Sequence, residues 1–268
     1  MSSVNVVTRY NVVSAGPADG PVLLLAHGFG CDQNLWRRVV PLLARDHRVV
    51  LFDHIGAGHA DRSAWTAQRY SSLDAYAEDV LTLCRELDLR DVTLVGHSVS
   101  AMIGVLAVAA DPDRFARLVL LTPSPCYLDD GDYHGGFSRQ DIDELLESLD
   151  SNYLGWSATM APVIMGNPDR PELGEELTNS FCRTDPEVAR VFARATFLSD
   201  NRADLAKVTV PTLVVQCSED AIAPRAVGEF VRDQIADATL VTLDAVGHCP
   251  QLSDPEPTAA AIAAFTGR

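Results

Sequence analysis

The chain has 268 residues and a formal net charge of −16, from 21 Lys and Arg against 37 Asp and Glu, a balance that repels nucleic-acid phosphates and excludes DNA or RNA as an expected partner. Hydrophobic residues make up 47% and charged residues 22%, which is typical of one globular α/β domain with room for an insertion. Neither a signal-peptide pattern nor an apolar run of about 18 residues occurs, so we expect a cytoplasmic protein without a membrane segment.

Short, continuous apolar runs recur along the chain, as expected for strands covered on both faces of a parallel sheet. They lie at 22–26, 49–52, 92–95, 118–121 and 212–215, and the strand pattern continues through 238–243. Helical patterns separate them, and the clearest places Tyr76, Val80, Leu83, Cys84 and Leu87 at helical spacing. This alternation predicts an α/β fold.

The alternation stops after residue 121 and resumes near residue 208. Between these points, helical stretches such as 140–149 and 186–195 occur without a convincing strand. We therefore predict a core made of residues 1–125 and 198–268, with residues 126–197 inserted as a helical lid. An apolar helix at about 255–265 ends the core.

The strongest local motif is Gly96-His97-Ser98-Val99-Ser100, in which a strand turns sharply into a helix. Small residues flanking such a turn let strand and helix approach while the serine stays exposed, as in the nucleophile elbow of serine hydrolases. The usual form is G-x-S-x-G, and Ser100 replaces its last glycine. Ser98 is the predicted nucleophile.

A serine hydroxyl needs a base, normally a histidine that a carboxylate orients. Asp220 follows the strand at 212–215, and His248 lies in a loop after the next strand. The order Ser98, Asp220, His248, each at the end of a strand, is that of the α/β-hydrolase triad. We predict nucleophile, acid and base in these positions.

Other residues compete for two of these roles. Glu219 is adjacent to Asp220, and Asp129 and Asp130 follow an earlier strand, so each is an alternative acid. His97 is adjacent to the serine, but neighbouring residues on an elbow point apart. We interpret His97 as structural or pocket-facing.

Acyl transfer also requires hydrogen-bond donors where negative charge develops. The glycine-rich loop 27–30 follows the first apolar run, and we predict that the backbone N–H groups of Phe29 and Val99 form this oxyanion hole. Aromatic residues are dense in 126–197, which predicts an apolar chamber for a small hydrophobic ligand. The predicted pocket residues are Phe29, His97, Tyr127, Phe137, Trp156, Met160, Phe181 and Phe197.

The sequence indicates no cofactor or metal. The stretch 53–58 follows a strand and contains Gly56 and Gly58, but Asp61 stands where a dinucleotide-binding motif has its third glycine. The six cysteines are scattered singly, as free thiols usually are, and no zinc-ligand spacing occurs.

Four segments together resemble the RsbQ-type bacterial stress-response regulators and the related plant receptors for strigolactones and karrikins. These segments are 25–33, the elbow 96–104 with the sequence G-H-S-V-S-A-M-I-G, the lid entry at 124–127 and 132–137, and 247–251. The similarity runs over nearly the whole chain, and Ser100 is normal in that group.

The resemblance implies an α/β-hydrolase fold with a mostly parallel eight-stranded sheet and a V-shaped lid of four helices over a buried apolar pocket. It also implies Ser98, Asp220 and His248 as the triad. In that group slow hydrolysis is coupled to signalling in some members, through a phosphatase-type regulator or through plant signalling proteins. Cys126 and Met160 depart from the group, so the ligand is expected to differ.

Two functions follow as hypotheses. In the first, the protein is a serine hydrolase that cleaves a small hydrophobic ester or lactone through an acyl-enzyme. In the second, it binds and slowly hydrolyses a small apolar ligand and acts through a protein partner. Other chemistries on this scaffold, such as perhydrolysis or carbon–carbon cleavage, are weaker alternatives. Haloalkane dehalogenase and epoxide hydrolase activities are disfavoured, because they use an aspartate where this chain has Ser98.

Overall fold

The computed structural model describes residues 5–267, which are built around a sheet in the order β1-β3-β2-β4-β5-β6-β7. The strands are β1 (Val13–Ala15), β2 (Val22–Ala26), β3 (Arg48–Leu51), β4 (Val92–His97), β5 (Phe115–Leu121), β6 (Thr212–Glu219) and β7 (Ala238–Val246). β1 pairs antiparallel with β3, and the other neighbours pair parallel. The five predicted apolar runs and the segment 238–243 correspond to β2 to β7, and the predicted α/β-hydrolase fold is confirmed.

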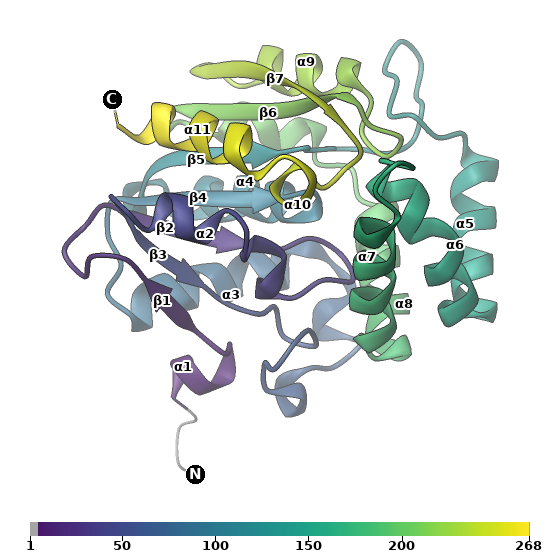
Figure 1. The fold of residues 1–268 in the computed structure, drawn as a ribbon, viewed down its shortest axis with the longest axis horizontal. Coiled ribbons are helices and arrows are strands. Elements are labelled where there is room, and N and C mark those ends of the chain that lie inside the picture. The colour runs from purple at the N-terminus through teal and green to yellow at the C-terminus, as the bar shows by residue number, and fades with distance from the viewer. Residues whose placement is uncertain (1–4, 268) are drawn as a thin grey trace.

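Helices cover both faces of this sheet (Figure 1). The core helices are α1 (Val6–Arg9), α2 (Val40–Leu43), α3 (Leu73–Glu86), α4 (Val99–Ala110), α9 (Arg225–Gln234), α10 (Pro250–Ser253) and α11 (Pro255–Thr266). Short 3₁₀ helices are η1 (Gln33–Trp36), η2 (Arg62–Ala64), η3 (Arg69–Ser71), η4 (Pro112–Arg114) and η5 (Arg202–Lys207). Within residues 5–267, no helix has the length and apolar character that a membrane span needs.

Alternate residues of the central strands fill two separate cores, because successive side chains of a strand point to opposite faces. In β2, Leu23 and Leu25 belong to the core under α2 and α11, whereas Leu24 and Ala26 belong to the larger core under α3 and α4. All four side chains are at most 1% exposed. Burial on both faces explains why these strands appear in the sequence as unbroken apolar runs.

The sheet has seven strands in the described residues, so the expected number of eight is wrong. The difference lies at the β1 edge, where the residues before the first strand form helix α1 instead of a further strand. Asn5 caps this helix by accepting a hydrogen bond from the backbone N–H of Val7 at 2.9 Å. The outer edge of β1 consequently carries no partner strand among residues 5–267.

Four helices separate β5 from β6 and lie beyond the carboxyl ends of the parallel strands (Figure 1). They are α5 (Arg139–Ser151), α6 (Tyr153–Met165), α7 (Pro171–Arg183) and α8 (Pro186–Phe197). We call them the helical insertion. Their position places the insertion directly over the turns that follow β2, β4 and β6.

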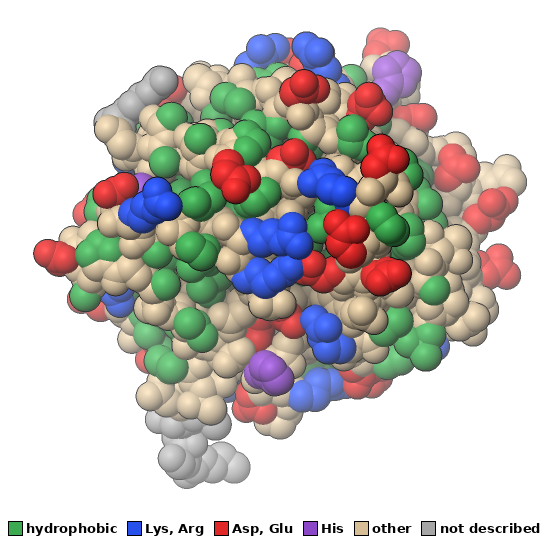
Figure 2. Space-filling view, viewed as in Figure 1, with side chains coloured by type: hydrophobic (Ala, Val, Ile, Leu, Met, Phe, Trp, Pro, Cys, Tyr) green, Lys and Arg blue, Asp and Glu red, His purple; other side chains and the backbone are tan. Residues whose placement is uncertain are grey.

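Ion pairs tie the insertion to the core. Glu176 of α7 pairs with Arg37 and lies 3.6 Å from Arg38, while Arg183 at the end of α7 lies 3.4 Å from Asp32. Figure 2 shows basic and acidic side chains intermingled near the centre of this face. Such partly exposed pairs contribute little energy each, so buried contacts must supply most of the attachment.

Candidate active site

Ser98 occupies the sharp turn between β4 and α4. Its φ of 57° is in the left-handed region, which non-glycine residues seldom adopt, and its N–H donates to the carbonyl of Leu121 at 2.9 Å. A side chain on Gly96 would collide with the backbone of Ser100, so glycine is required for strand and helix to approach this closely. The predicted elbow is present, with Ser98 at its apex.

A chain of two hydrogen bonds joins the three predicted residues. Nε2 of His248 lies 2.7 Å from Oγ of Ser98, and Nδ1 lies 2.7 Å from Oδ2 of Asp220. Since Asp220 accepts at Nδ1, the proton is on Nδ1 and Nε2 is free to accept the serine proton. The structure brings together the three side chains that the order of residues predicted.

Asp220 is fixed by its own turn. Its second oxygen, Oδ1, accepts hydrogen bonds from the backbone N–H groups of Ile222 at 2.8 Å and Ala223 at 3.1 Å. The carboxylate side chain is 0% exposed, so these donors replace the water that an exposed carboxylate would have.

The alternative acids lie elsewhere. Asp129 accepts a hydrogen bond from the N–H of Gly136 at 3.0 Å, and Asp130 forms an ion pair with Arg202 at 2.8 Å. Glu219 is exposed at the end of β6. Only Asp220, of these four carboxylates, contacts the histidine.

His97 is hydrogen-bonded to the backbone of the catalytic histidine candidate, His248. Its Nε2 donates to the backbone carbonyl of His248 at 2.8 Å, and its ring lies 5.3 Å from the imidazole of His248. Burial, reinforced by the nearby His248, lowers the pKa of His97 to about 3. His97 is therefore neutral near pH 7, and it both lines the cavity and holds the histidine loop.

The two predicted oxyanion donors are available. Val99 opens α4, so its N–H is one of those that a helix leaves unpaired at its start. Neither this N–H nor that of Phe29 donates to another residue in the described part of the chain. Gly28 sits against the ring of His97, where a Cβ would lie 2.6 Å from Nδ1, which keeps the Phe29 loop close to Ser98.

A cavity of about 30 Å³ lies beside Ser98 and His248. This is far below the several hundred Å³ of typical ligand pockets. Aromatic side chains fill the space, since Phe29 contacts the rings of Trp156, Phe181, Phe192 and Phe197 at centroid distances of 5.7–6.4 Å. The predicted chamber is thus apolar but small.

Six of the eight predicted pocket residues line this cavity, namely Phe29, His97, Tyr127, Trp156, Phe181 and Phe197. Phe137 and Met160 do not. They line a surface groove between α5 and α6 instead. Helical spacing puts Met160 one turn from Trp156, but α6 is rotated so that Met160 faces this groove.

Sequence reasoning missed six lining residues, which are Cys31, Ile164, Leu177, Thr196, Ile222 and Cys249. Two of them carried a signal, because Cys31 directly follows the loop 27–30 and Cys249 follows His248. Burial raises the pKa of the Cys31 thiol to about 12 and that of Cys249 well above its usual value, so both thiols stay protonated. They act as small apolar lining groups.

Ser100 holds the elbow to the loop that carries Phe29. Its Oγ donates to the carbonyl of His27 at 2.5 Å and lies 2.8 Å from Nε2 of His54. The backbone N–H of His54 in turn donates to Nε2 of His27 at 3.1 Å. A glycine at position 100 could not make these bonds, so the departure from G-x-S-x-G has a structural use here.

No group of three or more His, Cys, Asp and Glu side chains is arranged to hold a metal ion within residues 5–267. The acyl-transfer chemistry of a Ser-His-Asp arrangement requires no metal.

Residues 23–261 match the alpha/beta hydrolase family. The chain is 38% identical to "Strigolactone esterase D14" of Arabidopsis thaliana over 256 residues, or 95% of each protein. It is 39% identical to "Karrikin insensitive 2 receptor CA" of Petunia hybrida over 248 residues, or 92% of each. A solved hydrolase from Oleispira antarctica superimposes with a TM-score of 0.95 at 40% identity, over 98% of this chain and 97% of that one.

Proposed function

Because this chain belongs to the α/β-hydrolase family and is a hydrolase, we propose that it cleaves a small apolar ester or lactone through Ser98, His248 and Asp220. The observation that carries the proposal is the pair of 2.7 Å contacts of His248, one to the serine hydroxyl and one to the carboxylate. The apolar lining beside Ser98 supports an apolar substrate.

The proposed reaction has two halves. Oγ of Ser98 attacks the carbonyl carbon while Nε2 of His248 takes the serine proton, and the oxyanion accepts from the N–H groups of Phe29 and Val99. The bond to the leaving alkoxide oxygen then breaks as His248 gives that oxygen the proton. In a lactone, the released alcohol stays attached to the acyl group.

Water completes the cycle. The oxygen of a water molecule attacks the acyl carbon while His248 takes a proton from that water. His248 returns the proton to Oγ of Ser98 when the bond between Oγ and the acyl carbon breaks. Asp220 stabilises the imidazolium that forms in each half. The products are a carboxylic acid and an alcohol.

Hydrolysis of p-nitrophenyl esters and butenolide lactones by wild type and Ser98→Ala tests this proposal. We expect the substitution to lower kcat by about three orders of magnitude or more. Ser151→Ala, an exposed change on α5, is the control and should match wild type. A Ser98→Ala protein that keeps its fold and the wild-type rate would disprove the assignment.

The small volume of the cavity favours a second candidate function, that of a ligand sensor. At about 30 Å³ the cavity cannot hold an ester without movement of the helical insertion, which then acts as a lid. A moved lid presents a different surface, which a protein partner such as a phosphatase-type regulator in the cytoplasm could bind. A relative named as a receptor supports this candidate.

Single-turnover measurements on the same substrates distinguish the metabolic hydrolase from the ligand sensor. Fast multiple turnover supports a metabolic hydrolase. One slow turnover that leaves a stabilised protein supports a sensor.

A further inference from the structure

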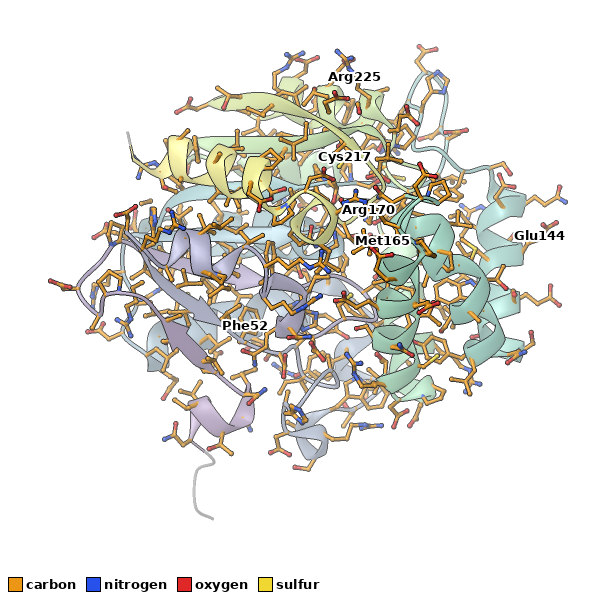
Figure 3. The ribbon with its side chains drawn as sticks, viewed as in Figure 1. Phe52, Glu144, Met165, Arg170, Cys217 and Arg225 are labelled. Atoms are coloured by element: carbon orange, nitrogen blue, oxygen red, sulfur yellow. The ribbon has the colours of Figure 1, made fainter. Side chains whose placement is uncertain are left out.

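The turn between α6 and α7 packs directly against the segment that carries His248. Gly166 and Gly247 face each other with φ values of 61° and 94°, a region that glycine enters without strain. A side chain on Gly247 would collide with the carbonyl of Met165, and one on Gly166 would lie 3.2 Å from Cα of Gly247. Backbone thus meets backbone here, and Figure 3 shows Met165 at this junction.

Asn167 joins the two segments with its side chain. Its Nδ2 donates to the carbonyl of Val246 at 2.7 Å and to the carbonyl of Met165 at 2.9 Å. Arg170 donates to Oδ1 of Asn167, which fixes the orientation of the amide, and its Nη1 also donates to the carbonyl of Ser253 at 2.6 Å. One side chain in the insertion therefore holds the backbone two residues before His248.

The backbone of His248 is held from both sides. Its N–H donates to the carbonyl of Ile164, at the end of α6, at 2.9 Å. Its carbonyl accepts from Nε2 of His97 at 2.8 Å and from Oγ1 of Thr122 at 3.2 Å. The insertion holds the amide and the core holds the carbonyl, so the position of the imidazole depends on both.

We propose that Asn167 is a positioning residue for the hydrolytic reaction, an inference that rests on the proposed function of Ser98 and His248. Asn167 acts through Val246 and is not among the residues that line the cavity. Nε2 of His248 must stay within hydrogen-bond reach of Ser98, and a displacement of about 1 Å at a reacting group can cost about 10²-fold in rate. Loss of the Asn167 bonds should therefore lower kcat and leave KM nearly unchanged.

Asn167→Gly is the sharpest test, because Asn167 has a φ of 58° that glycine adopts freely. The variant removes both donated bonds without straining the turn, and we expect kcat to fall about tenfold to a hundredfold. Asn167→Asp replaces the donor by a carboxylate facing two carbonyl oxygens and should lose at least as much. Asn152→Ala is the matched control, since Asn152 caps the opposite end of α6 by accepting from the N–H of Gly155 at 3.0 Å.

A spectroscopic signature separates positioning from a general loss of stability. The proton between Nδ1 of His248 and the carboxylate of Asp220 should give a low-field proton NMR resonance. The loss of this resonance in Asp220→Asn assigns it. In Asn167→Gly, measured well below the unfolding temperature, this resonance should shift or broaden. In Asn152→Ala it should match wild type.

Wild-type kcat and an unchanged resonance in Asn167→Gly would overturn the inference, and so would a loss of kcat equal to that of Asn152→Ala at equal stability. If wild type shows no hydrolysis that depends on Ser98, the proposed function fails. The resonance then decides alone whether Asn167 positions His248.

Discussion

At the scale of single residues, Ser100 shows how a departure from a motif can be structural. Its hydroxyl is fully buried, donates to the carbonyl of His27 and accepts from Nε2 of His54, whose own Nδ1 has no partner in the described part of the chain. Burial holds the pKa of His54 well below its usual value, so the ring is neutral and has a single N–H to donate. The hydroxyl of Ser100 accepts the hydrogen bond from this N–H.

We therefore expect Ser100→Ala to destabilise the fold. The change leaves a buried N–H and a buried carbonyl without partners, at a cost of about 1–3 kcal/mol for each group left unsatisfied. Urea unfolding of the variant, compared with that of the exposed Ser151→Ala, measures the difference. Equal free energies of unfolding for Ser100→Ala and wild type would show that the network contributes nothing.

The triad could be predicted from sequence because each member follows a segment that was predicted as a strand, namely the apolar runs at 92–95 and 212–215 and the segment 238–243. Parallel strands end at one edge of a sheet, so Ser98, Asp220 and His248 had to meet there. Asn167 could not be found in this way. Its role depends on a contact between α6–α7 and the His248 loop, and no local pattern in either segment signals that contact.

At the scale of elements, prediction found β2 to β7 and missed β1. The run at 22–26 coincides with β2, and the run at 212–215 covers the first four of the six buried residues of β6. β1 was missed because Val13–Ala15 is short and largely exposed, so it leaves no apolar run. The helical insertion was predicted, but which side of α6 faces the serine depends on packing against α5 and α7.

The insertion closes the site mainly through Phe181 of α7. Its ring is 2% exposed, stacks on Trp156 at 5.8 Å with an interplanar angle of 10°, and meets Phe29 edge-on at 5.7 Å. Gly30 lies under the same ring, where any side chain would collide with it. Phe181 therefore limits the depth of the cavity beside Ser98.

Shortening Phe181 should widen the range of substrates. We expect Phe181→Ala to lose about 3–5 kcal/mol of stability and to raise kcat/KM for p-nitrophenyl hexanoate relative to acetate, because the new space lies beside Ser98. Phe181→Leu is a milder variant that keeps the fold if the alanine protein does not. Phe115→Ala removes a buried ring that does not line the cavity, and should lose stability without changing the preference for chain length. An unchanged preference in both Phe181 variants would contradict this assignment.

At the scale of the whole molecule, the site lies between the sheet and the helical insertion. The larger core continues from the sheet, α3 and α4 into the insertion, which also meets the rest of the molecule through a few ion pairs and the Gly166–Gly247 contact. Beneath this junction lie three buried histidines, His27, His54 and His97. Placing so many titratable rings under the site makes the stability of the whole fold dependent on pH.

Burial lowers the pKa of all three rings, that of His97 to about 3. Between about pH 6.5 and the lowered pKa of the folded rings, these histidines are protonated in the unfolded state and neutral in the folded state. The unfolded state therefore binds more protons in this range. The contribution of each ring is therefore complete above about pH 6.5 and is lost, at about 1.4 kcal/mol per pH unit, as the pH falls toward the folded pKa. The raised pKa of buried Asp79 acts in the opposite direction, but it is one group against three.

We thus expect the free energy of unfolding to fall steeply between about pH 6.5 and about pH 5, at several kcal/mol per pH unit. Urea unfolding across this range measures the slope, and His54→Gln should reduce it by about 1.4 kcal/mol per pH unit because one titrating ring is gone. The exposed His134→Gln is the control. A flat profile in wild type, or a slope that His54→Gln leaves intact, would mean that the buried rings take up protons in the folded state, and the fixed N–H donors inferred for His54 and His97 would fail with it.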